Sequence, residues 1–343
     1  MRFLCFGVGA IGTYIGGSLV LAGHRVVFVE RPGVVEDVRA RGLALERADG
    51  KHRVDTPEVV ESVEAALALS SFDAALLAVK SFDTQSVIDS LLPHKDALPP
   101  IVSFQNGVEN EALLAAALGQ DKVIPGTVTT AVGRNGPGDI VVEKLRGIGI
   151  ATNHPLGAAL VPVMASAGLR ARGYANPAAM KWSKMLTNLL TNATSAILDM
   201  TPAQVFASPD LFCIEARQLR EALRVMDKMN IPVVDLPSTP VRALAFAISR
   251  LPLGISRPLL ARFVGKGRGN KMPSFHIDLH AGRGKSEVDY LNGAVARYGE
   301  KYHVATPVNS TLTRILLALT DGSLQKDSYA HQPEKLLAEI PGE

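Results

Sequence analysis

The first 31 residues, MRFLCFGVGAIGTYIGGSLVLAGHRVVFVER, restrict the possible folds more than any other part of the chain. An apolar run of β-forming residues at 3–6 leads into glycines at positions 7, 9 and 12, in the pattern G-x-G-x-x-G. A helix is predicted over 10–22 and a second strand over 24–29. Strand, glycine turn, helix and strand in this order are typical of the start of a dinucleotide-binding domain.

Each glycine of this pattern has a separate physical role. Gly7 permits a tight turn, Gly9 lets a pyrophosphate approach the backbone, and Gly12 lets the helix pack closely against the strand. The free N–H groups and the partial positive charge at the start of the helix attract phosphate. We therefore expect this turn to bind a dinucleotide through the residues Gly7, Val8, Gly9, Ala10, Ile11 and Gly12.

The same stretch has other interpretations, because residues 3–23 carry no charge and could form a signal peptide or a membrane span. Its glycines make a poor membrane helix, and a second strand follows it, so no membrane partner is expected. A formal net charge of +3 over 343 residues does not predict binding to nucleic acid. The two cysteines, Cys5 and Cys213, lie far apart in the sequence, as in proteins of a reducing cytoplasm.

The pattern beyond the first unit predicts two domains. Apolar segments typical of buried strands recur at 72–79, 101–104, 123–132 and 139–151, and predicted helices separate most of them. This alternation predicts an α/β Rossmann domain with a doubly wound, mainly parallel sheet. From about residue 177 the pattern is helical only. We expect a dinucleotide-binding domain over 1–174, an all-α domain over 175–330 and a frayed polar tail over 331–343.

Polar residues directly follow several predicted strands. Glu30 and Arg31 follow the second strand, and Lys80 and Asn106 follow two later ones. Because ligands of such sheets bind beyond the carboxyl ends of the strands, these residues are expected to share one crevice with the glycine turn. Glu30 favours the free ribose hydroxyls of NAD, whereas Arg31 favours the 2′-phosphate of NADP, and the sequence leaves both open.

Three polar residues interrupt a long apolar helix predicted over 178–198. Lys184, Asn188 and Asn192 are spaced four apart, so they would lie on one face of a continuous helix. A lysine and two asparagines among apolar side chains are costly to bury without polar partners. The stripe therefore indicates either a surface for a polar ligand or the solvent-facing side of the helix.

Two later features are not assigned to a site. Seven bases and no acid lie between Asp235 and Asp278, which predicts the solvated face of a helical hairpin or, alternatively, a surface for an anion or an acidic membrane. His276 and His280 have the i, i+4 spacing of metal ligands. No third ligand follows in the pattern of zinc proteases, so no metal site is expected.

The chain resembles the ketopantoate reductases (2-dehydropantoate 2-reductases) over nearly its whole length. The segments that carry the resemblance are G-V-G-A-I-G from Gly7, A-V-K ending at Lys80, Q-N-G around Asn106, K-x-x-x-N-x-x-x-N from Lys184, P-S at Pro273 and Ser274, and S-E-V-D-Y-L-N-G from Ser286. Many dehydrogenases share the first motif, whereas the last four, in this order and spacing, are specific.

The resemblance implies a Rossmann domain, a helical domain and an active site in the cleft between them. It implies hydride transfer from NADPH to the 2-oxo group of ketopantoate, giving pantoate in pantothenate biosynthesis. Hydride delivery leaves negative charge on the carbonyl oxygen, so a positioned acid or cation must meet it. The resemblance gives that role to Lys184, the general acid, with Glu287 binding substrate and assisting catalysis.

The resemblance also implies the remaining contacts. Asn188, Asn192 and Ser274 would hold the substrate, a small 2-oxo acid. Lys80 and Asn106 would lie beside the cofactor and the reacting carbonyl. Arg31 would face the 2′-phosphate of NADPH, with the acidic Glu30 as its neighbour. We expect a cytoplasmic monomer or homodimer.

Two alternatives to ketopantoate reduction stay open at this stage. One is a reductase of another branched 2-oxo acid with the same mechanism. The other is a protein that senses NADP without turning it over. The presence of both Lys184 and Glu287 argues against the sensor, because sensing needs the glycine turn but not an acid.

Overall fold

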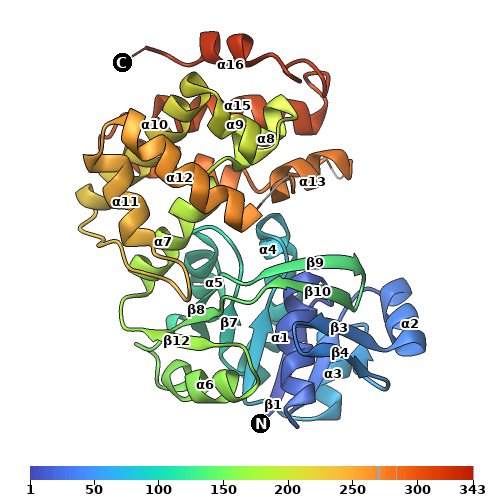
Figure 1. Ribbon diagram of the computed structural model, residues 1–343. Helices are drawn as coiled ribbons and strands as arrows, with labels where there is room; N and C mark the ends of the chain where they lie inside the picture. The colour runs from blue at the N-terminus through green and yellow to red at the C-terminus, as the bar shows by residue number, and fades with distance from the viewer. Residues whose placement is uncertain (269–270, 283, 343) are drawn as a thin grey trace. The chain divides into compact units, whose positions relative to one another are not determined.

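The computed structural model describes residues 1–268, 271–282 and 284–342, and the chain divides into two compact units (Figure 1). The sheet unit comprises Met1–Lys181 and Leu236–Thr239, and the helical unit comprises Trp182–Asp235 and Pro240–Glu343. The division falls inside one helix, α7 (Pro177–Leu189).

Within the described residues, an eight-stranded sheet forms the centre of the sheet unit. In spatial order its strands are β12 (Ala171–Tyr174), β11 (Ile148–Ala151), β8 (Val123–Val128), β7 (Ile101–Ser103), β6 (Ala74–Leu77), β1 (Arg2–Phe6), β2 (Arg25–Val29) and β5 (Glu58–Val60). Neighbouring strands are parallel except β8 and β11, which pair antiparallel. The mainly parallel sheet predicted from the sequence is confirmed.

Helices cover both faces of this sheet, which is why its central strands are continuously apolar. The α-helices of the unit that precede α7 are α1 (Ala10–Leu21), α2 (Pro32–Arg41), α3 (Val63–Leu69), α4 (Thr84–Leu91), α5 (Asn110–Leu118) and α6 (Pro155–Ser166). Alternate residues of β1 enter different cores: Phe3 and Cys5 pack with α1 and α6, whereas Leu4 and Phe6 pack with α3, α4 and α5. Burial raises the pKa of the Cys5 thiol, so this cysteine is a protonated core residue.

A second, smaller sheet corrects one sequence prediction. Its strands, in spatial order, are β4 (Gly50–Val54), β3 (Leu43–Arg47), β10 (Asp139–Lys144) and β9 (Ala131–Gly136). The long strands predicted at 123–132 and 139–151 are therefore wrong, because each divides between the two sheets. Gly147 separates β10 from β11 with a φ of +139°, and a Cβ there would lie 2.5 Å from the Arg170 carbonyl oxygen. Only glycine fits this turn without strain.

The helical unit contains the second part of α7, and its described residues form no strand within a sheet. Its other elements are α8 (Asn192–Leu198), α9 (Pro202–Ala207), α10 (Pro209–Lys228), α11 (Val241–Arg250), α12 (Leu253–Arg268), α13 (Ser274–His280), the π-helical turn η4 (Asp289–Gly293), α14 (Ala294–Lys301), α15 (Pro307–Asp321) and α16 (Pro333–Glu339). The change to helices after residue 177 is confirmed. The basic segment forms α11 and α12, although its side chains at 262–270 lie outside the described ones.

The end of the chain is more ordered than its composition predicts. The sequence predicted a frayed tail, but α16 forms there and buries Leu336 completely. Arg314 Nη2 on α15 donates to Glu339 Oε2 at 2.7 Å, which ties α16 to the rest of the unit. Among the described residues, no helix combines the length and the apolar character needed to cross a membrane.

Candidate functional site

The glycine turn of the sheet unit has the geometry that a dinucleotide needs. Gly7 has a φ of +95°, and a Cβ at Gly12 would lie 2.0 Å from the Gly7 carbonyl oxygen, so helix and turn touch there. Gly9 is the N-cap of α1 and makes no side-chain cap, and a Cβ at Gly9 would meet no atom within 4 Å. The turn is therefore closed at Gly12 and open at Gly9, where a pyrophosphate would approach the helix N-terminus.

Glu30 and Arg31, at the end of β2, have different environments. The Glu30 carboxylate accepts the Val8 N–H at 3.1 Å and the Arg31 N–H at 3.0 Å, and its side chain is 17% exposed. The Arg31 side chain is 86% exposed, with Nε 3.5 Å from Glu30 Oε1. Glu30 thus fixes the glycine turn to β2, while the guanidinium of Arg31 extends into solvent beside it.

Lys80 and Asn106 lie in two turns that hydrogen bonds join. The Ser81 hydroxyl donates to the Asn106 carbonyl at 3.0 Å, and Gln105 Nε2 donates to the Lys80 carbonyl at 3.5 Å. The strands β7, β6, β1 and β2 are consecutive in the parallel part of the sheet. The structure therefore brings the glycine turn, Glu30, Lys80 and Asn106 to one edge of the sheet.

A buried lysine that the sequence reasoning missed supports the Asn106 turn. Lys181 Nζ donates to the Gln105 carbonyl at 2.6 Å and to Glu111 Oε1 at 2.7 Å, and the two side chains are 6% and 13% exposed. The same Glu111 oxygen accepts the Ser103 hydroxyl at 2.9 Å. Within the sheet unit, the ion pair connects α7 to α5, and the bond to Gln105 connects α7 to the turn that follows β7.

The sequence predicted that Lys184, Asn188 and Asn192 lie on one face of a continuous helix. This prediction is wrong for Asn192. The helix breaks after Leu189, because Thr191 has a φ of +60° and Asn192 begins α8. Lys184 and Asn188 remain four apart on α7, the first half-buried and the second 9% exposed. Asn192 is placed instead by the break, so its position depends on the turn rather than on helical spacing.

The break places Asn192 beside Ser274, the first residue of α13. Asn192 Nδ2 donates to the Ser274 hydroxyl at 3.3 Å, and Asn192 Oδ1 accepts the Phe275 N–H at 3.1 Å. Because Phe275 lies in the first turn of α13, the Asn192 amide also caps that helix. Glu287 is 1% exposed and lies just before the π-helical turn η4, a distortion frequent at functional sites.

A second network that the sequence reasoning missed supports this break from α10. The fully buried Glu215 accepts the Thr191 N–H at 2.6 Å and the Thr194 hydroxyl at 2.5 Å. Gln218 Nε2 donates to Glu215 at 2.6 Å, and Gln218 Oε1 accepts from Asn292 Nδ2, in η4, at 3.0 Å. Through Glu215 and Gln218, these hydrogen bonds connect the left-handed turn at Thr191, which places Asn192, to the π-helical turn η4.

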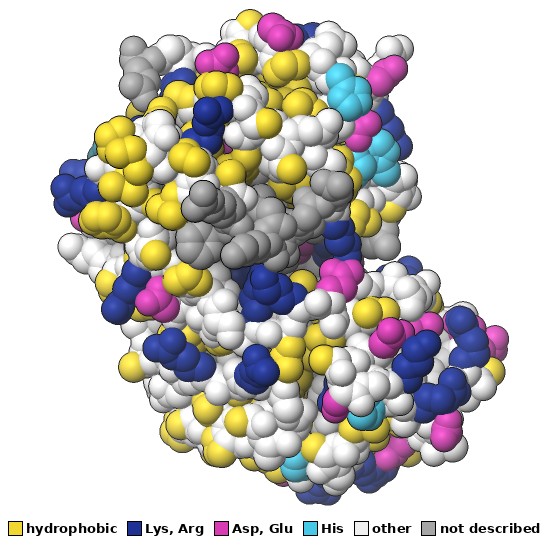
Figure 2. Space-filling view, viewed as in Figure 1, with side chains coloured by type: hydrophobic (Ala, Val, Ile, Leu, Met, Phe, Trp, Pro, Cys, Tyr) yellow, Lys and Arg dark blue, Asp and Glu magenta, His cyan; other side chains and the backbone are white. Residues whose placement is uncertain are grey.

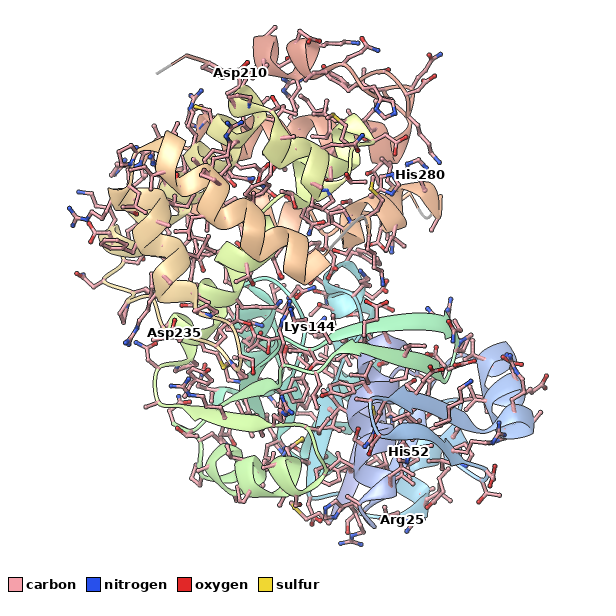
Figure 3. The ribbon with its side chains drawn as sticks, viewed as in Figure 1. Arg25, His52, Lys144, Asp210, Asp235 and His280 are labelled. Atoms are coloured by element: carbon pink, nitrogen blue, oxygen red, sulfur yellow. The ribbon has the colours of Figure 1, made fainter. Side chains whose placement is uncertain are left out.

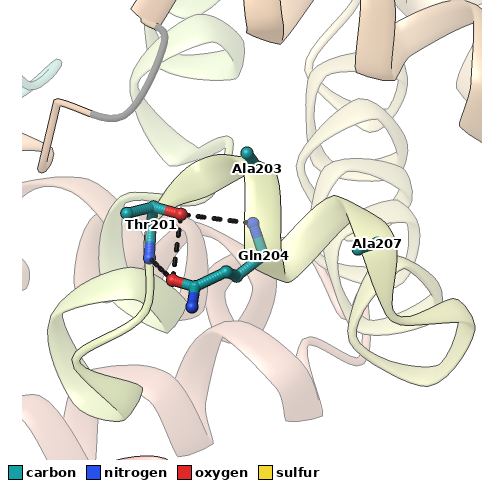
Figure 4. A pocket seen from close by; sticks show the side chains of 4 residues that line it. All are labelled: Thr201, Ala203, Gln204 and Ala207. Carbon is teal, nitrogen blue, oxygen red and sulfur yellow. Dashed lines mark hydrogen bonds between the residues drawn. The ribbon is translucent and has the colours of Figure 1, made fainter.

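A shallow pocket on α9 is not a candidate for this chemistry. Its described lining consists of Thr201, Ala203, Gln204 and Ala207 (Figure 4). The Thr201 hydroxyl and the Gln204 side chain satisfy each other's backbone groups in a capping box. These four side chains include no acid or base that could transfer a proton.

Both units of the chain match models of one protein family. Residues 3–153 match the model described as "Ketopantoate reductase PanE/ApbA", and residues 176–320 match that described as "Ketopantoate reductase PanE/ApbA C terminal". The chain belongs to the ketopantoate reductase family. Members of this family are oxidoreductases that depend on pyridine nucleotides.

Individual ketopantoate reductases support this assignment over their whole length. The chain is 27% identical to a 2-dehydropantoate 2-reductase of Halobacterium salinarum, with 94% of this chain and 100% of that protein covered. It is 26% identical to a 2-dehydropantoate 2-reductase of Archaeoglobus fulgidus, with coverage of 94% and 98%. A crystal structure of a PanE/ApbA family ketopantoate reductase from Ralstonia eutropha matches with a TM-score of 0.78, 27% identity and coverage of 94% and 99%.

Proposed function

We propose that the protein reduces 2-dehydropantoate to pantoate with NADPH as the hydride donor. The observation that carries the proposal is the full-length family match combined with the family's motif residues at Lys184, Asn192, Ser274 and Glu287. In this proposal, residues 1–174 bind the cofactor and residues 175–330 bind the substrate. Incubation with NADPH and ketopantoate is expected to give one pantoate for each NADPH oxidised, as measured by mass spectrometry.

The residues of the sheet unit fit a dinucleotide. The open space at Gly9 accepts the pyrophosphate, and the N-terminus of α1 offers it N–H groups. When bound, NADPH supplies the hydride that reduces the 2-oxo carbon. The exposed guanidinium of Arg31 binds the 2′-phosphate, since Glu30 already accepts two backbone N–H groups.

The helical unit supplies the acid and the substrate contacts in this proposal. Lys184 donates a proton to the carbonyl oxygen as negative charge develops on it, and its ammonium also stabilises that charge. Glu287 binds substrate and assists this step from a buried position. Asn188, Asn192 and Ser274 hold the hydroxyl and carboxylate of the substrate, and Asn106 lies by the carbonyl.

Arg31→Ala is expected to raise KM for NADPH roughly 10- to 100-fold, because a charge-assisted hydrogen bond contributes about 1.5–3 kcal/mol. The activity with NADH should change little, since NADH lacks the 2′-phosphate. The control is Arg2→Ala, an exposed arginine at the opposite end of β1. A preference for NADH in the unaltered protein, together with no effect of Arg31→Ala, would assign the ribose contact to Glu30 instead.

Substitutions at Gly9 and Gly12 should separate cofactor binding from folding. Gly9→Ala is expected to keep the melting temperature and weaken NADPH binding at least about tenfold, because the added methyl group enters the phosphate space. Gly12→Ala is expected to destabilise the sheet unit, since its Cβ would overlap the Gly7 carbonyl oxygen.

The control for these two substitutions is Gly136→Ala. As at Gly9, a Cβ at Gly136 would meet no atom within 4 Å, but Gly136 lies in β9 of the second sheet. It should change neither melting temperature nor NADPH affinity. Unchanged NADPH binding by Gly9→Ala, measured by protein fluorescence, would contradict a pyrophosphate at this position.

A further inference from the structure

A cluster of histidines lies in the helical unit, at residues to which the proposed reaction gives no role. His276 and His280 lie one turn apart on α13, and their ring centroids are 4.0 Å apart. His276 Nε2 lies 2.6 Å from Oδ1 of Asp199, the residue that follows α8. Figure 2 shows histidine side chains gathered beside an acidic one on the surface, and Figure 3 labels His280 at the end of α13.

The distances within this cluster are close to those around a bound metal. One ligand atom each from Asp199, His276 and His280 can be chosen so that all three lie within 4.8 Å of one another. Tetrahedral zinc, with bonds of about 2.0–2.2 Å, separates its ligand atoms by about 3.4 Å. Because the side chains are partly exposed, small rotations can close this difference.

A third imidazole, that of His331, lies at the edge of the cluster. His331 Nε2 is 3.9 Å from Asp199 Oδ2, and the His331 N–H donates to the Leu198 carbonyl at 2.8 Å. That backbone bond holds His331 beside the end of α8. The cluster therefore draws on three separate segments: the residue after α8, the helix α13 and the segment before α16.

The donor atoms of the cluster are of the kinds that zinc binds. Asp199 contributes a carboxylate oxygen, and His276 and His280 contribute ring nitrogens. Carboxylate oxygen and imidazole nitrogen are both common ligands of zinc in proteins.

We propose that Asp199, His276 and His280 bind a divalent transition metal, with Zn²⁺ as the best match, and that His331 or water completes the coordination. Two or three imidazoles with one carboxylate suit zinc, whereas Mg²⁺ and Ca²⁺ prefer oxygen ligands. The sequence showed the i, i+4 histidines but not their partner, because Asp199 lies 77 residues before His276. Such a metal would join α8 to α13 and stabilise the helical unit.

The test uses the untagged full-length protein after dialysis against chelator. Titration calorimetry with Zn²⁺ is expected to show one site with a micromolar or lower Kd, and Mg²⁺ should give no heat of binding. Co²⁺ should produce the visible absorption bands of a tetrahedral site. Zn²⁺ at about a hundredfold excess over Kd should raise the melting temperature by about 5 °C.

Asp199→Asn and His280→Ala are each expected to weaken Zn²⁺ binding at least about tenfold and to remove the thermal shift. The matched control is His303→Asn, an exposed histidine of the same unit with a φ of +57°, a conformation that asparagine tolerates. Melting in chelator shows whether each variant folds. Wild-type protein that binds no Zn²⁺, or variants that bind it as tightly as His303→Asn does, would overturn the proposal.

Discussion

Lys184→Ala is expected to lower kcat for ketopantoate reduction by about 10²- to 10⁴-fold, the usual contribution of a positioned general acid. The Kd for NADPH should change less than about twofold, because the proposed role of Lys184 is in proton transfer and not in cofactor binding. Stopped-flow turnover and fluorescence titration with NADPH measure the two quantities separately. Small primary amines added to the Lys184→Ala variant should restore part of the rate.

The control for this prediction is Lys228→Ala, which removes an exposed lysine at the end of α10 in the same unit. Its kcat should match that of the unaltered protein. A Lys184→Ala variant that keeps its kcat would show that another group protonates the carbonyl oxygen. A variant that loses NADPH affinity in proportion to kcat would place Lys184 in cofactor binding instead.

Lys181→Met is expected to reduce the free energy of unfolding of the sheet unit by about 3–5 kcal/mol. The substitution leaves the Glu111 carboxylate charged, only 13% exposed and without its ammonium partner. It also removes the bond from Lys181 Nζ to the Gln105 carbonyl at 2.6 Å. Thermal melting should show a decrease of about 10 °C.

Two comparisons isolate the buried charge from other effects of the Lys181 change. The double variant Lys181→Met with Glu111→Gln should recover a large part of the lost stability, because no unpaired charge is left. Lys51→Met removes the lysine of an exposed pair, whose side chains are 82% and 48% exposed, and should cost no more than about 1 kcal/mol. Equal effects of Lys51→Met and Lys181→Met would contradict the account of the buried pair.

The sequence predicted the sheet unit well where local patterns determine the structure. The G-x-G-x-x-G pattern is local, and Gly7, Gly9 and Gly12 have the turn, the open space and the close approach that the pattern requires. Most strands of the eight-stranded sheet lie within apolar runs, so their existence was predictable, whereas the short strands β5 and β12 were not predicted. The boundary between β10 and β11 was missed because it depends on a contact of Gly147 with the distant Arg170.

Non-local contacts determine most of what the sequence did not show. No proline or glycine marks the break between α7 and α8 in the sequence. The break occurs at Thr191, whose left-handed conformation is stabilised by a hydrogen bond to the distant Glu215. Lys181 could have been noticed as a second lysine in the apolar segment M-K-W-S-K, but its partner Glu111 lies 70 residues away. The role of a buried charge depends on such partners, and periodicity alone does not identify them.

The most direct test of the proposed function is the loss of NADPH absorbance with ketopantoate, repeated with NADH and with other branched 2-oxo acids. The account predicts that kcat/KM for ketopantoate with NADPH exceeds that of every other pair by at least about tenfold. Faster reduction of another 2-oxo acid would keep the mechanism and change the substrate. Tight NADPH binding without turnover of any of these acids would contradict the assignment of Lys184 and Glu287 to catalysis.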